Sequence, residues 1–185
     1  MTTPAPALYL AFLRGVMPSG KNAVNMAALR QALDEEGLGP VRTWIQSGNV
    51  LLHSALDASA TAARVRQCIR QRLGPDLPVI VKTPEQVNAV LLGNPFTGSG
   101  HDLSRVFFSL SQHPPPPARA AALMAQDFGD EKLHIGPYAA YLYLPGSAAR
   151  SRLGNHFLEK HLHLEMTTRN ANTLGKMLAL AACAH

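Results

Sequence analysis

The order of short apolar segments and amphipathic helical segments constrains this chain most. A run of four to eight apolar and β-branched residues between turn residues predicts a strand. Apolar residues that recur three and four positions apart predict a helix. Asn25 and Gly37 bracket one such helix as its cap and its stop. In order, the predicted elements are a strand at 8–13, a helix at 26–36, a hairpin with strands at 41–45 and 50–53, a helix at 59–73 and a strand at 78–82.

The second half of the chain repeats much of this order. Thr83 and Pro84 open a helix, as cap and first helical residue, and a proline run at 114–117 starts another. We find no residue-level repeat between the halves, so a duplication is inferred from element order alone. The predicted elements are a helix to about 92, a strand at 105–111, a helix to about 128, a hairpin at 132–144 around Gly136-Pro137, and helices near 148–160 and 171–183.

The order β-α-β-β-α-β is that of a split βαβ unit, which folds as a four-stranded antiparallel sheet with two helices on one face. We therefore predict an α+β protein of two ferredoxin-like subdomains and a C-terminal helix. The first subdomain covers residues 1–82 with a flexible tail at 1–7, residues 83–103 connect, and residues 104–185 form the second.

Composition indicates a packed globule, since hydrophobic residues make up 46% of the chain and charged residues 16%. The net charge of +5 favours anionic partners such as a phosphorylated ligand, and supports nucleic acid only weakly because the charges are not clustered. The first residues lack a signal-peptide pattern, and no apolar run is long enough to span a bilayer. We expect a cytoplasmic protein without a membrane partner, with Cys68 and Cys183 as buried thiols.

The segment after the first strand resembles a phosphate-binding loop. Gly15 to Lys21 fits Gly-x-x-x-x-Gly-Lys, but Asn22 stands where a Ser or Thr hydroxyl would coordinate magnesium. The predicted antiparallel order is also wrong for a nucleotide hydrolase of that type. Two interpretations stay open: Arg14, Lys21 and the loop amides bind an anion without hydrolysis, or the loop is a glycine-rich turn whose polar groups satisfy its own backbone.

Polar residues before the last predicted helix suggest a second contribution to such a site. Helix capping accounts for Asn170 or Asn172, but it does not account for Arg169, whose guanidinium suits a carboxylate or phosphate. The histidines between 156 and 163 match no metal-site spacing, and Ser47 has no triad partners, so we predict neither metal nor cofactor. Tyr141 and Tyr143 are interpreted as core or interface residues.

Six separated motifs resemble the bacterial family called domain of unknown function 1697, over about residues 8–180. The resemblance implies two ferredoxin-like subdomains and implies no reaction, substrate or cofactor. Here the loop reads Gly-Val-Met-Pro-Ser-Gly rather than the family's Gly-Ile-Asn-Val-Gly-Gly, and Ala171 replaces a usual Trp. The motifs are Leu13-Arg-Gly15, Gly20-Lys-Asn22, Met26-Ala-Ala-Leu29, Ile45-Gln-Ser-Gly-Asn-Val50, Asn94-Pro-Phe96, and Thr168-Arg-Asn170 with Asn172-Thr173.

The leading hypothesis is a binding protein with an anion-lined cleft between the subdomains, because polar residues gather at strand ends and turns. A metal-independent enzyme acting on a phosphorylated small molecule, with Lys21 or Arg169 stabilising developing charge, is one alternative. A protein-interaction or oligomerisation module is the other. The predicted ligand-binding residues are Arg14, Lys21, Asn22, Arg42, Gln46, Asn49, Arg169 and Asn170.

Overall fold

A computed structural model of the chain describes residues 5–184. Its contacts divide the chain into two compact units, one of residues up to Glu85 together with residues from Lys176 onward, and one of residues 86–175. Residues from 176 onward thus group with the first unit and not with the second half of the chain. Of the predicted flexible tail, residues 1–4 lie outside the described part of the chain, and Ala7 already belongs to the first strand.

The first unit is a ferredoxin-like α+β fold, as predicted. Its sheet has the strand order β2-β3-β1-β4, with antiparallel neighbours throughout. Its elements are β1 (Ala7–Leu13), α1 (Met26–Glu35), β2 (Arg42–Trp44), β3 (Asn49–Ser54), α2 (Ala58–Arg72) and β4 (Val79–Lys82).

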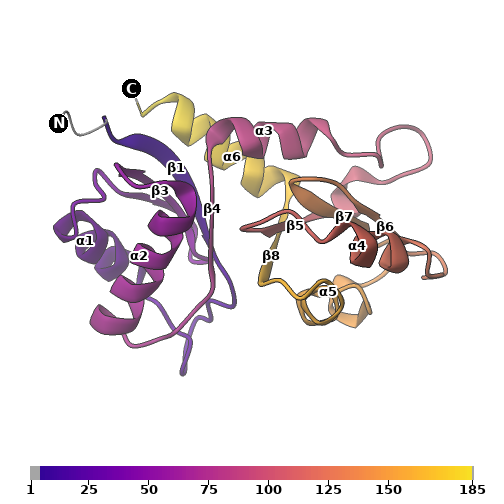
Figure 1. Cartoon of the computed structure of the whole chain (residues 1–185), viewed down its shortest axis with the longest axis horizontal. Coiled ribbons are helices and arrows are strands. Elements are labelled where there is room, and N and C mark those ends of the chain that lie inside the picture. Colours follow the sequence, from indigo (N-terminus) through magenta and orange to yellow (C-terminus); the bar gives the residue numbers. More distant parts are fainter. Residues whose placement is uncertain (1–4, 185) are drawn as a thin grey trace. The chain divides into compact units, whose positions relative to one another are not determined.

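Helices α1 and α2 cover one face of this sheet (Figure 1). Tyr9, Ala11 and Leu13 alternate along β1 and point into a core shared with Leu29 of α1 and Val65 of α2. Successive residues of a strand face opposite sides, so Leu10 and Phe12 lie on the other face, where they are also buried. Both faces are therefore apolar, which explains why β1 reads as a continuous apolar run.

The start of α1 follows the sequence prediction. Asn25 adopts extended backbone geometry, and its side-chain oxygen accepts the N–H of Ala28 at 3.0 Å. The cap satisfies one of the donors that a helix N-terminus leaves unpaired. Gly37, with a φ of 76°, follows the end of the helix, so the predicted stop is also found.

The second unit repeats the first, with the strand order β6-β7-β5-β8 and antiparallel neighbours. The division between the units falls within α3 and within α6. The remaining elements are α3 (Pro84–Leu92), η1 (Leu103–Arg105), β5 (Val106–Ser111), α4 (Pro117–Met124), β6 (Lys132–Ile135), β7 (Ala139–Tyr143), η2 (Ala148–Arg150), α5 (Asn155–Leu162), β8 (Met166–Asn170) and α6 (Ala171–Ala182).

Three predictions for this half need correction. Residues 166–170 form an edge strand, β8, although their polar sequence suggested only a segment leading into the last helix. The helix predicted at 148–160 is a short 3-10 helix, η2, followed by α5, and Gly154 caps the latter. Cys68 is buried as predicted, but Cys183, which directly follows α6, is exposed.

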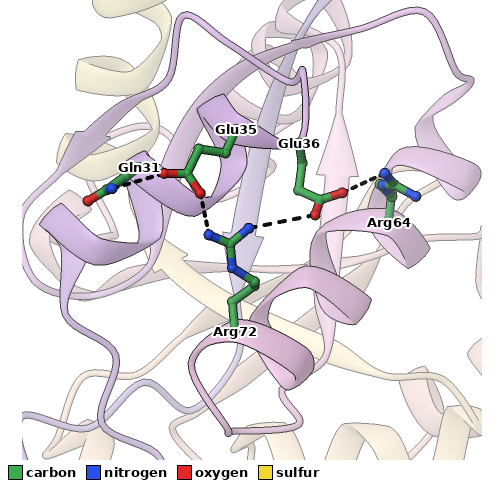
Figure 2. Close-up of polar contacts among 5 residues, drawn as sticks. All are labelled: Gln31, Glu35, Glu36, Arg64 and Arg72. Atoms are coloured by element: carbon green, nitrogen blue, oxygen red, sulfur yellow. Dashed lines mark hydrogen bonds and ion pairs between the residues drawn. The ribbon is translucent and has the colours of Figure 1, made fainter.

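Two arginines of the first unit, Arg64 and Arg72, have acidic partners (Figure 2). Arg72 of α2 lies between Glu35 and Glu36, and Arg64 pairs with Glu36 at 2.5 Å. The hydrogen bond from Arg72 lowers the pKa of the Glu35 carboxyl. These arginines are neutralised locally, which removes them as candidates for an anion site.

None of the described helices combines the length and apolar character that crossing a membrane requires.

Candidate functional site

The loop that follows β1 carries the first cluster of predicted site residues. Two backbone hydrogen bonds hold its start, because Leu13 N–H donates to Gly48 O at 2.8 Å and Arg14 N–H donates to Pro78 O at 2.9 Å. The main chain of Arg14 is thus held between the β2-β3 turn and the residue before β4. Its side chain is partly buried.

The loop closes on itself through its own backbone. Met17 N–H donates to Asn22 O at 3.0 Å, and Ala23 N–H donates to Gly20 O at 3.1 Å. Gly15 and Gly20 have φ angles of 74° and 84°, a conformation that costs glycine nothing. Lys21 is exposed at the tip. The loop of residues 14–22 is therefore a hydrogen-bonded turn with one basic residue at its start and another near its end.

The turn between β2 and β3 supports this loop. Gln46 Nε2 donates to Val24 O at 2.7 Å, which joins the turn to the end of the loop. Asn49 is fully buried, and its Nδ2 donates to Trp44 O at 3.2 Å and to Ser47 Oγ at 2.8 Å. Both side chains hold local structure, so the role that the structure gives them is support of the loop.

Gly48 brings the turn into contact with β1. Its φ is 76°, and a Cβ atom added there would lie 2.6 Å from Leu13 Cβ and 2.8 Å from Val16 Cγ2. Only glycine fits this contact without displacement of its neighbours. Five of the predicted residues, Arg14, Lys21, Asn22, Gln46 and Asn49, therefore belong to one connected loop region, while Arg42 is exposed on β2, the strand that leads to the turn.

The other two predicted residues belong to β8 of the second unit. Arg169 Nη1 donates to Thr167 Oγ1 at 2.8 Å and to Thr168 O at 2.9 Å. Burial lowers the pKa of this guanidinium to about 10. Arg169 pairs with Phe108 and Asn170 with Phe107, so the two residues project from opposite faces of the sheet.

Asn170 is the cap of α6, one of the two interpretations that its sequence position left open. Its side-chain oxygen accepts the N–H of Thr173 at 2.8 Å. A hollow of ≈ 370 Å³ adjoins this helix start. Ala171 lines it with only a methyl group. The lining residues are Leu103, Ser104, Asn170, Ala171 and Asn172.

Lys82 is a buried basic residue that the sequence prediction missed. It ends β4 and is only 5% exposed, and burial lowers the pKa of its ammonium group to about 8. Lysine is rarely buried to this degree, and buried lysines with lowered pKa values occur at functional sites. The sequence feature that could have indicated its burial is its position directly after the apolar run Val79–Val81.

The sequence itself places the chain in a family. The model of the family described as protein of unknown function DUF1697 matches residues 7–141. The chain belongs to this family. Among curated proteins, no relative matches the DUF1697 chain. The fold and the family membership expected from the six motifs are confirmed, and the family has no assigned function.

A solved structure shares the fold of this DUF1697 protein. It is the conserved bacterial protein SP0830 from Streptococcus pneumoniae, with a TM-score of 0.71 and 24% sequence identity. The match covers 96% of this chain and 99% of the streptococcal one. At this identity the likeness shows the fold alone.

Among the described residues, no group of three or more His, Cys, Asp and Glu side chains is arranged to hold a metal ion.

Proposed function

We propose that this DUF1697 protein binds a phosphorylated small molecule at the loop of residues 14–22. The observation that supports this best is the ordered loop, which is tied to the β2-β3 turn and to Pro78 by hydrogen bonds and carries Arg14 and Lys21. Glycine turns of this kind present backbone N–H groups to an anion, and a basic side chain adds a charged donor. Because the loop is already ordered, binding costs little conformational entropy.

The residues around the loop take different roles in this proposal. Arg14 and Lys21 contact the anion, whereas Asn22, Gln46 and Asn49 keep the loop in its binding conformation. Arg42, Arg169 and Asn170 stay predicted contacts whose contribution the same titrations measure. The net charge of +5 adds long-range attraction for an anion, although it does not select a site.

Thermal-shift and equilibrium binding measurements with nucleotides, sugar phosphates and short oligonucleotides test the proposal. We expect at least one phosphorylated compound to raise the melting temperature. Flat responses throughout would overturn the proposal. Turnover of a bound compound would instead support the enzyme alternative, and a concentration-dependent mass without any ligand response would support the interaction module.

A charge-matched pair of variants separates a local site from a general charge effect. Lys21→Ala removes the basic group of the loop, and Lys160→Ala removes an exposed lysine of α5 in the second unit. Both lower the net charge by one. We expect Lys21→Ala to weaken binding about tenfold, since a charge-assisted hydrogen bond contributes about 1.5 kcal/mol or more, and Lys160→Ala to leave it unchanged. Equal effects would show that only overall charge matters.

A further inference from the structure

Two large apolar side chains are exposed in the loop region. Met17 in the loop is 53% exposed, and Ile45 in the turn is 55% exposed. Met17 forms a bridge with Ala23, and the next residue, Val24, accepts the hydrogen bond of Gln46, the neighbour of Ile45. Both side chains thus belong to the same connected region as Arg14 and Lys21. Single exposed apolar side chains are common, but exposed apolar side chains that share one region with polar residues are typical of interaction sites.

Ile45 is also held in a strained backbone conformation. Its φ is 49°, in the left-handed region, where a β-branched residue is an outlier that costs on the order of 1–2 kcal/mol. The hydrogen bonds from Asn49 to Trp44 and Ser47 close the turn that contains Ile45. Strained residues of this kind cluster at active sites, ligand-binding sites and switch regions.

We infer that the ligand is a soluble phosphate monoester with an apolar organic group, whose phosphate contacts the loop and whose apolar group covers Met17 and Ile45. This inference rests on the proposed function and adds the chemical class of the ligand. Basic and apolar groups in one connected region complement a ligand that carries both characters, whereas inorganic phosphate would leave the two apolar side chains exposed.

Calorimetric titrations with methyl phosphate, hexyl phosphate and hexanol test the inference. We expect hexyl phosphate to bind about tenfold or more tightly than methyl phosphate, because each methylene removed from water adds favourable free energy. Hexanol should bind more weakly than either. If methyl and hexyl phosphate bind equally, the inference is wrong while the proposed function stands. If neither binds although a nucleotide or sugar phosphate does, the inference is wrong while the proposed function stands. If no phosphorylated compound binds, the proposed function fails and the inference fails with it.

Two variants locate the apolar contact. Ile45→Asn keeps a residue that tolerates a positive φ but removes the apolar side chain, so we expect the affinity for hexyl phosphate to fall toward that for methyl phosphate, which itself stays unchanged. Leu56→Asn removes another exposed apolar residue of the first unit, 46% exposed, and should change neither affinity. Equal losses in both variants, or binding to phosphatidic acid vesicles without binding to hexyl phosphate, would overturn the inference.

Discussion

Single residues in unusual conformations are the most informative feature of this protein at the residue scale. Two residues other than glycine have a positive φ among those described, Ile45 and His163. His163 follows α5 as its C-cap, where a left-handed residue ends a helix normally. Ile45 has no such role, and it is the residue type least suited to the conformation. Its strain therefore belongs to the turn and predicts a gain in stability on replacement.

Ile45→Asn should stabilise the folded protein by about 1 kcal/mol, because asparagine adopts positive φ at lower cost than a β-branched residue. Chemical denaturation of both proteins measures the difference in free energy of unfolding. Leu56→Asn is the matched control, since Leu56 is a similarly exposed apolar residue without a positive φ, and it should not be stabilised. A lower stability of Ile45→Asn would contradict the strain argument.

At the scale of elements, the passage from β8 into α6 gives the polar residues at 167–173 different structural roles. Thr167 is buried in the sheet, Arg169 bonds to neighbouring threonines, and Asn170 caps the helix. The strand was missed because its sequence, Met-Thr-Thr-Arg-Asn, has no apolar run, whereas the pairing of β8 with β5 compensates with backbone hydrogen bonds and β-branched threonines. Capping alone was predictable from the local sequence.

Substitutions at Asn170 separate the cap from the predicted anion contact. Asn170→Ala should lower the free energy of unfolding by about 1 kcal/mol through loss of the cap, and Asn170→Asp should retain that stability because aspartate caps equally well. Denaturation curves of the three proteins measure this. If Asn170 also contacts an anion, Asn170→Asp should weaken binding by charge repulsion. Full stability of Asn170→Ala would show that the cap contributes nothing.

At the scale of the whole molecule, the two units place a basic residue at the same strand position, Lys82 buried in one unit and Arg169 partly buried in the other. In the first unit, Lys82 of β4 pairs with Leu10, which is the fourth paired residue from the C-terminal end of β1. In the second unit, Arg169 of β8 pairs with Phe108, which is the fourth paired residue from the C-terminal end of β5. Both basic residues lie on the face opposite the paired helices, and burial lowers the pKa of each. The correspondence supports the duplication inferred from element order.

Lys82 should make the stability of the whole protein depend on alkaline pH. Its pKa is about 8 in the folded state and 10.5 ordinarily, so between these values the unfolded chain binds a proton that the folded chain lacks. The destabilisation by the buried Lys82 charge is therefore fully present below about pH 8, and it is relieved as pH rises from about 8 to about 10.5. Urea denaturation at several pH values measures the change.

Lys82→Met provides the control, because methionine keeps most of the side-chain volume without the charge. We expect the variant to be more stable than the wild type at neutral pH, by on the order of 3 kcal/mol at most, since one pKa unit corresponds to about 1.4 kcal/mol. The difference should shrink toward pH 10.5. A difference that does not change with pH would mean that the burial of the charge has no energetic consequence.

The sequence by itself determined the fold class, most element positions and the family, because these depend on local periodicity, caps and turn residues such as Asn25 and Gly48. It also indicated Arg14 and Lys21 at the loop after the first strand, and Arg169 before the last helix, as candidate basic residues. Only the tertiary structure decided that Gln46 and Asn49 support the loop, that Ile45 is strained and exposed, and that Lys82 is buried. These properties arise from contacts between segments distant in sequence, and local patterns carry no information about burial or strain of that origin.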